Sequence, residues 1–244
     1  MNGRLHALVR LFAVQGTWNY ERMLGVGMGY AAEPLLEDLK LSDPQRHTEA
    51  VVRSAEFFNC NPNLAGLALG AEVRAEYDGA PGAQVARLRT ALCSPLGALG
   101  DQLFWAGLVP ALVGLALAAV TLGAGLWAVL GLLVVYNAVR IWTAAWALRT
   151  GLTAGMHVGT AIGRSWVPRA AAAVGPAAGF GVGVALPLLA VWYLRPFPPT
   201  AGLGALGLTA LGLGAGYVAG ARYGALRYAL LAVLVTVLVR LAVH

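Results

Sequence analysis

The sequence predicts an all-α integral membrane protein, in which N-terminal amphipathic or interfacial helices precede a glycine-rich bundle of about four to five transmembrane or re-entrant helices. Composition supports this class, because 59% of the 244 residues are hydrophobic and only 11% are charged. A soluble domain carries about a quarter charged residues. The charges are also uneven: all 11 acidic residues lie at or before Asp101.

This asymmetry divides the chain into an N-terminal helical region, residues 1–102, and a hydrophobic transmembrane region, residues 103–244. The first region carries 9 Lys and Arg against 11 acidic residues, a net charge of −2, and the second carries 8 arginines and no acid. These arginines stand singly between apolar stretches. Such spacing is typical of snorkelling or lipid-headgroup contact, and it argues against binding to nucleic acid.

The N-terminal region shows helical periodicity interrupted by turn residues. Leu5, Leu8 and Val9 share one face of the first helix, which could lie on a membrane surface. Asp43 and Pro44 supply an N-cap and a first-turn proline for the third. The expected helices cover residues 4–14, 34–40, 44–58, 63–77 and 83–93, with breaks at 59–62 and 78–82.

The second region is hydrophobic at bilayer length. Residues 103–122 contain no charge and are long enough to cross about 30 Å of hydrocarbon. Four spans are expected, over residues 103–122, 124–148, 170–194 and 202–221. A fifth stretch, 225–239, is short enough to be tilted, re-entrant or packed on a partner. Arginines in nearly every connection leave the orientation undecided.

Glycines recur at fourfold spacing in three places. They are Gly151, Gly155, Gly159 and Gly163; Gly175, Gly179 and Gly183; and Gly212, Gly216, Gly220 and Gly224. On a helix this spacing removes Cβ atoms from one stripe, so that another helix can approach closely, within the chain or from another subunit. General enrichment in small residues is the alternative explanation.

No pattern predicts a catalytic, cofactor or metal site. The four histidines are far apart and form no HExxH pair. A GxGxxG match at residues 202–207 lies in a hydrophobic span with no preceding strand, so it is accidental. Cys60 and Cys93 make no disulfide framework and no CxxC motif.

Two polar features are candidates for function. Asp101 either caps the first span as its N-terminal residue or accepts hydrogen bonds at a permeation path or subunit contact, and the two roles are compatible. Asn59 and Asn61 follow Phe58 in a stretch that either forms a turn or solvates a neutral polyol.

A third feature precedes them in the chain. Gln15, Trp18, Asn19 and Glu21 combine amides, an aromatic ring and a carboxylate within seven residues. They could equally be the interfacial end of an amphipathic helix with its aromatic anchor.

Three sequence blocks carry a family resemblance. Residues 15–22 (QGTWNYER) are close to QGSWNYER, residues 56–62 (EFFNCNP) to EFFNTNP, and residues 94–105 (SPLGALGDQLFW) to GPLAGIGDSLFW. In this order, and followed by a glycine-rich hydrophobic half, they resemble the IID subunits of the mannose/fructose/sorbose-class phosphoenolpyruvate-dependent sugar phosphotransferase transporters. The resemblance covers residues 11–163. Ser54 and Ala55 depart from it where the family has a histidine before Glu-Phe-Phe, and Ser94 replaces a glycine.

The resemblance implies a multi-pass protein of the bacterial inner membrane that pairs with a IIC subunit, in a higher oligomer of IIC–IID pairs within the lipid bilayer. It implies transport of a mannose-type sugar, phosphorylated by a cytoplasmic IIAB protein; the IID subunit itself accepts no phosphate and is not an enzyme. The expected sugar path is lined by Gln15, Trp18, Asn19, Glu21, Phe58, Asn59, Asn61 and Asp101. The alternative is an assembly, scaffold or regulatory subunit of the same complex that does not bind sugar.

Overall fold

The computed structural model describes residues 3–195 together with 204 and 207, and the chain forms two compact units, residues 1–186 and 187–244. In the described residues all regular structure is helical, and extended pairing is limited to two isolated bridges. The predicted all-α class is therefore confirmed. The spans expected at 202–221 and 225–239 lie almost wholly outside the described residues, so the number of spans stays a prediction.

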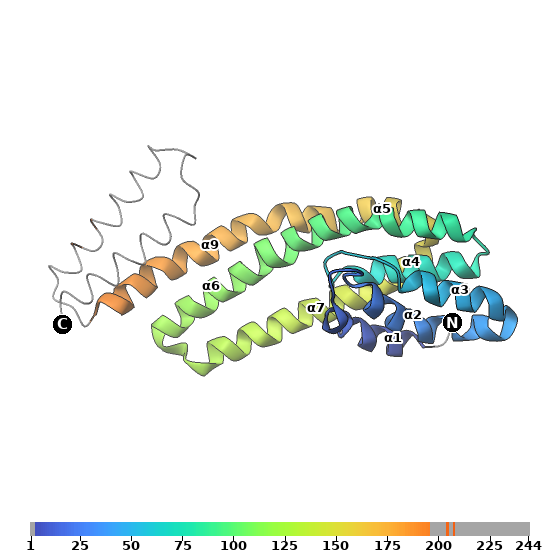
Figure 1. Cartoon of the computed structure of the whole chain (residues 1–244). Helices are drawn as coiled ribbons and strands as arrows, with labels where there is room; N and C mark the ends of the chain where they lie inside the picture. Colours follow the sequence, from blue (N-terminus) through green and yellow to red (C-terminus); the bar gives the residue numbers. More distant parts are fainter. Residues whose placement is uncertain (1–2, 196–203, 205–206, 208–244) are drawn as a thin grey trace. The chain divides into compact units, whose positions relative to one another are not determined.

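The described helices follow one another with short connections (Figure 1). Those labelled η are 3₁₀-helices (η1, η4) or π-helices (η2, η3). In order they are α1 (Arg4–Leu11), η1 (Val14–Thr17), α2 (Gly25–Ser42), α3 (Pro44–Ser54), α4 (Ala65–Tyr77), α5 (Gly82–Gly100), η2 (Asp101–Leu108), α6 (Val109–Ala119), η3 (Val120–Ala124), α7 (Leu126–Ala154), η4 (Gly155–His157), α8 (Val158–Arg164) and α9 (Val167–Leu194).

Helix α2 is longer than predicted, because Pro34 lies inside it and does not begin it. Proline lacks the N–H that would bond to the carbonyl four residues earlier, here that of Tyr30. Nη1 of Arg10 on α1 donates to this carbonyl at 2.8 Å and supplies the missing bond. The three glycines that begin α2 made it hard to recognise in the sequence, since glycine is a poor helix former.

Helix α3 begins as predicted and ends early. Asp43 accepts a hydrogen bond from the backbone N–H of Arg46 at 2.9 Å, with Pro44 in the first turn, as expected of an N-cap. The helix ends at Ser54 and not at residue 58. Residues 55–64, called the connector below, leave the helix and lead to α4.

The helix expected at residues 83–93 and the span expected from residue 103 form one helix. A continuous helical stretch, Gly82–Thr121, runs through α5, the eight-residue π-helix η2 and α6. The interpretation of Asp101 as an N-cap is therefore wrong, because its own N–H already bonds to the carbonyls of Gly97 and Ala98. The change in composition near residue 102 falls inside this helix.

Two stretches, Gly82–Thr121 and Leu126–Tyr193, are long and apolar enough to cross a membrane, judged by length and composition. They are joined by a tight turn at Gly123 and Gly125, both with positive φ. The predicted spans at 103–122, 124–148 and 170–194 fall within these stretches.

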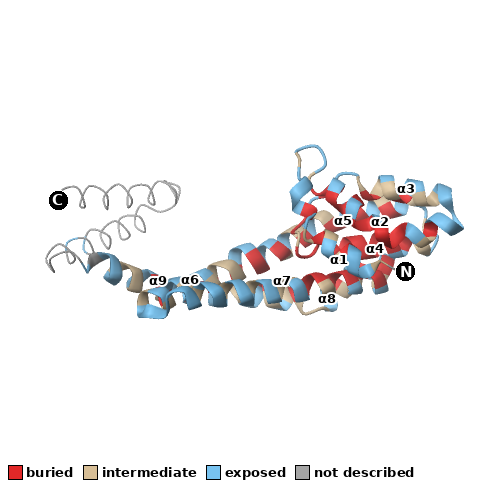
Figure 2. Ribbon diagram, turned by 90° about the horizontal axis from the view of Figure 1, so that it is seen from below, coloured by how far each residue is buried: buried red, intermediate tan, exposed pale blue. Residues whose placement is uncertain are grey.

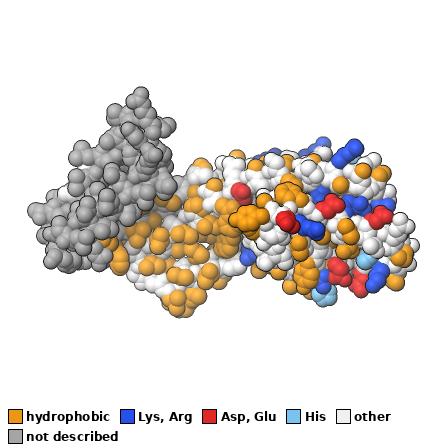
Figure 3. Space-filling model, in the orientation of Figure 1, with side chains coloured by type: hydrophobic (Ala, Val, Ile, Leu, Met, Phe, Trp, Pro, Cys, Tyr) orange, Lys and Arg blue, Asp and Glu red, His pale blue; other side chains and the backbone are white. Residues whose placement is uncertain are grey.

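The main hydrophobic core lies among α1–α5 and the C-terminal half of α7 (Figure 2). Charged side chains gather over the same N-terminal helices, whereas the visible face of the α6–α7 hairpin is apolar (Figure 3). On this face the charged side chains thus lie over the part of the molecule that contains the three sequence blocks.

Close helix contacts use glycines other than most of the predicted ones. Gly66 and Gly70 of α4 cross Gly151 of α7, and Gly114 of α6 meets Gly181 of α9. Gly155 has φ 51° and ends α7, so the first predicted ridge does not continue along one helix. Among the described residues, a Cβ would meet no neighbour at Gly159, Gly163, Gly175, Gly179 or Gly183. The ridge at residues 212–224 lies outside the described residues.

Candidate functional site

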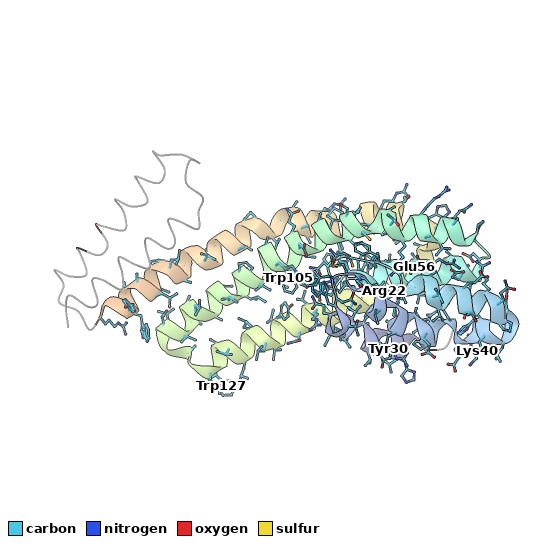
Figure 4. The ribbon with its side chains drawn as sticks, viewed as in Figure 1. Arg22, Tyr30, Lys40, Glu56, Trp105 and Trp127 are labelled. Atoms are coloured by element: carbon cyan, nitrogen blue, oxygen red, sulfur yellow. The ribbon has the colours of Figure 1, made fainter. Side chains whose placement is uncertain are left out.

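The first two sequence blocks are joined through their backbones. The N–H of Phe58 donates to the carbonyl of Arg22 at 3.2 Å, and the N–H of Leu24 donates to the carbonyl of Phe58 at 2.8 Å. Residues 18–24, the loop between η1 and α2, thus pair with the middle of the connector. Figure 4 labels Arg22 and Glu56 at this junction.

Asn19 shapes this loop with its own side chain. Its Oδ1 accepts hydrogen bonds from the backbone N–H groups of Glu21 at 3.1 Å and Arg22 at 2.8 Å, and its Nδ2 donates to the carbonyl of Thr17 at 3.3 Å. These local bonds are a common role of asparagine in turns. They stabilise the tight turn that places Met23 at φ 52°.

Asn61 joins the second block to the third. Only 1% of its surface is exposed. Its Nδ2 donates to Oδ1 of Asp101 at 2.9 Å, and its Oδ1 accepts from the N–H of Asn63 at 3.1 Å. The position before Asp101 must be glycine, because a Cβ on Gly100 would collide with the Asn61 side chain.

Asp101 is the first residue of the π-helix η2, and its side chain is exposed. One carboxylate oxygen accepts the bond from Asn61. The other has no hydrogen bond within the part of the chain that the structure describes. π-helical segments occur frequently at functional sites. Trp105, one turn further on, is also exposed.

The remaining predicted site residues fall into an exposed and a buried group. Gln15, Trp18, Glu21 and Asn59 are exposed, and Trp18 stacks edge-on against Tyr20 with ring centroids 4.8 Å apart. Phe58 is fully buried, so its ring supports the connector from beneath and does not face solvent. Its neighbour Phe57 is the exposed ring of the pair.

Sequence reasoning missed a buried ion pair beneath the connector. Nη1 of Arg89 on α5 donates to Oε2 of Glu72 on α4 at 2.7 Å, and both residues are 2% exposed. Burial raises the pKa of Glu72 to about 7, against the opposing effect of the Arg89 charge. The sequence signal was a single carboxylate in the apolar run before Val73, which by itself does not name its partner.

A second buried carboxylate lies one turn further along α4. Glu76 accepts a hydrogen bond from Nε of Arg53 at 2.9 Å, and Nη2 of Arg46 lies 3.0 Å from its other oxygen. Arg46 also donates to the carbonyl of Ala80 at 2.6 Å. This network ties α3 to α4 and to the start of α5.

Taken together, the three blocks bring amides, the exposed carboxylates of Glu21, Glu56 and Asp101, and exposed aromatic rings into the region above a buried ionic layer. Within residues 3–195 no three metal-ligating side chains gather in one place. Hydrogen-bonding groups beside aromatic faces suit recognition of a neutral, hydroxylated molecule.

Comparisons with known proteins place the sequence in context. The family described as "PTS system mannose/fructose/sorbose family IID component" matches residues 2–183. The mannose-specific EIID component of Escherichia coli strain K12 is 28% identical over 149 residues, which are 59% of this chain and 52% of that protein. The fructose permease IID component of Bacillus subtilis strain 168 is 29% identical over 148 residues, 59% of this chain and 53% of that one.

Solved structures agree on the fold. A cryo-EM structure of the mannose transporter ManYZ bound to a microcin matches with a TM-score of 0.55 and 23% identity, over 74% of this chain and 67% of the matched chain. A structure described only as a membrane protein matches with a TM-score of 0.63 and 24% identity over the same shares. The chain spans about half the length of the curated relatives it matches.

Proposed function

Because the chain belongs to the family of IID components of mannose/fructose/sorbose phosphotransferase systems, we propose that it forms the sugar translocation unit of such a transporter together with a IIC subunit. The family match over residues 2–183 supports the subunit assignment. Relatives named for mannose, fructose and sorbose support a hexose-type sugar as cargo. The place of action is the bacterial inner membrane, with several passes.

The hydrogen bond between Asn61 and Asp101 carries the proposal. It brings a motif of the connector and a motif of the π-helix into one polar pair, and it leaves one carboxylate oxygen of Asp101 available. Such an oxygen can replace water around a sugar hydroxyl. The exposed rings of Trp18, Phe57 and Trp105 supply apolar faces of the kind that pack against the C–H face of a sugar.

The chain itself performs no phosphate chemistry in this proposal. A cytoplasmic IIAB protein phosphorylates the sugar, and the IID subunit contributes solvation and shape. Higher assemblies of IIC–IID pairs complete the unit.

A scaffold role is the second candidate, and a specific observation favours it. The side chains of Asn19 and Asn61 are committed to intramolecular hydrogen bonds, and Phe58 is buried. These residues would then shape a surface for IIC without touching sugar.

One substitution, Asp101→Asn, distinguishes the sugar-binding role from the scaffold role. The chain is co-expressed with a IIC subunit encoded next to it, purified by a tag on this chain and titrated with labelled mannose. Asp101→Asn keeps the size and removes the charge, and Asp78→Asn is the matched control at an exposed acid on α4's C-terminal side. A sugar site predicts roughly tenfold weaker binding for Asp101→Asn in an intact complex.

Loss of co-purification with Asp101→Asn, with binding unchanged in whatever complex remains, would favour the scaffold. A IIC subunit that carries sugar at full rate without this chain would refute both candidates.

A further inference from the structure

We propose that Arg89 is a positioning residue that holds the connector in the conformation in which Asn61 meets Asp101, and that Glu72 orients Arg89 for this task. The expected effect on transport rests on the proposed function, because the connector conformation affects transport only if Asn61 and Asp101 take part in it. The conformational claim itself concerns only residues of this chain.

The Arg89 side chain binds the connector through hydrogen bonds to its backbone. Its Nη2 donates to the carbonyl of Glu56 at 2.9 Å, and its Nε donates to the carbonyl of Phe57 at 3.4 Å. The guanidinium carbon lies 4.8 Å from the centre of the Phe58 ring. One side chain thus contacts three consecutive residues of the connector.

The geometry of these bonds requires an arginine. A guanidinium presents several N–H donors in a rigid planar fork, so it can satisfy a carboxylate and two backbone carbonyls at once. Because Glu72 accepts from Nη1, the remaining donors point toward the connector. A lysine at position 89 would keep the charge and lose the fork.

The connector has little freedom to shift without breaking the polar pair. Phe58 is paired through its backbone with residues 22 and 24, and Asn61 follows three residues later. Asn61 packs directly against Gly100, where even a Cβ would not fit. A displacement at residues 56–58 therefore reaches the bond between Asn61 and Asp101.

A natural comparison lies one turn along α4. Glu76 is as buried as Glu72 and is paired with Arg53, but within the described residues the Arg53 side chain donates to no connector carbonyl. If buried ion pairs served only to stabilise the helices, both pairs would behave alike. A positioning role for Arg89 predicts that replacing Arg89, but not Arg53, moves the connector.

Cys60 is a built-in reporter of connector position. It lies in the connector between Phe58 and Asn61 and is 8% exposed. Maleimide labelling of the purified full chain is followed by peptide mass spectrometry, which resolves Cys60 from the internal reference Cys93. Arg89→Lys should label at Cys60 roughly tenfold faster than the wild type, whereas Arg53→Lys should label at the wild-type rate.

A double variant separates positioning from stability. Replacing a buried ion pair by apolar residues of similar volume often leaves stability unchanged or raises it. Arg89→Met with Glu72→Met should therefore keep its thermal midpoint and still expose Cys60. Wild-type protection of Cys60 in both the double variant and Arg89→Lys would overturn the proposal.

Mannose titration of the same preparations in complex with IIC tests the consequence. Faster labelling of Cys60 with weaker sugar binding in Arg89→Lys supports the whole inference. Faster labelling with unchanged binding overturns the link to the sugar site. If the wild-type complex binds no mannose while Cys60 still responds, the positioning role stands and the proposed cargo is wrong.

Discussion

The helices α1–α5 and the described helices that follow them are stabilised in different ways. The N-terminal helices enclose most of the main hydrophobic core and two buried carboxylates, Glu72 and Glu76. The most apolar window of Gly82–Thr121 is 33% buried and that of Leu126–Tyr193 only 17%. Many exposed side chains on the described helices after α5 are leucine, valine or tryptophan.

The difference indicates that exposed side chains have polar surroundings in one region of this molecule and apolar surroundings in the other. In the N-terminal helices, exposed positions lie among charged side chains, which gather on this part of the surface. Along α6, α7 and α9 most of the described exposed positions are apolar, with exceptions such as Asn137, Arg149 and Arg169. Close backbone contacts there involve glycines such as Gly114 and Gly181. Close backbone approach replaces hydrophobic burial where the solvent is itself apolar.

The largest expected effect lies where the two regions meet. A Cβ at Gly70 would lie 2.7 Å from the backbone oxygen of Leu148, so the backbones of α4 and α7 would have to separate. Gly70→Val should cost more than about 3 kcal/mol and abolish a monodisperse peak in size-exclusion chromatography. Gly175→Val, where a Cβ meets no neighbour among the described residues, is the matched control. Equal damage from Gly175→Val would show that this face of α9 is covered in the assembled protein.

A buried charge in lipid should produce the next largest effect. Val134 on α7 is 68% exposed, in a stretch from residue 102 to 139 without charge, and Val52 on α3 is 62% exposed. Val134→Asp should impair membrane insertion by about 3 kcal/mol, whereas Val52→Asp should not. The yield of protein in carbonate-washed membranes measures this. Comparable yields would mean that Val134 faces water.

The buried carboxylate Glu72 predicts a pH dependence. Its folded pKa of about 7 lies above the ordinary value of 4.5, so between these values the folded state binds more protons and the free energy of unfolding falls as pH rises. Burial is the main cause, opposed by Arg89; Glu76 adds to the rise and Arg53 opposes it.

The contribution lost between pH 5 and pH 7 is about 2 to 3 kcal/mol. Glu72→Gln should therefore make the thermal midpoint less dependent on pH across this range. An unchanged pH profile in Glu72→Gln would show that other groups produce the dependence.

The sequence predicted the helical class, and three of its expected spans fall within the long apolar helices, because composition and periodicity reflect the surroundings of the side chains. It also predicted the N-cap at Asp43, where capping chemistry is local. It failed at Asp101, since a change from charged to apolar composition was taken as the start of a helix. Only the structure shows that α5 continues through this point.

For the candidate site, the sequence proposed residues but could not predict their arrangement. The pairing of Asn61 with Asp101 joins positions 40 residues apart, and no local pattern predicts it. Arg89 was missed for the same reason: its partners lie 17 to 33 residues away. The need for glycine at position 100 also depends on a distant residue, because the Asn61 side chain packs against it.

The smallest effect is expected at an ion pair that resembles Arg89–Glu72 in chemistry but not in surroundings. Arg74 and Asp78 are paired at 2.9 Å in i,i+4 spacing on the surface of α4 and its C-cap. Exposed pairs of this kind contribute little, because water solvates both charges in either state. Asp78→Asn should leave the thermal midpoint within error at low and high salt, whereas Glu72→Ala should lower it clearly because it leaves Arg89 buried without its partner. A salt-sensitive loss in Asp78→Asn would mean that this end of α4 is covered in the assembled protein, so that the two pairs differ less than the isolated chain indicates.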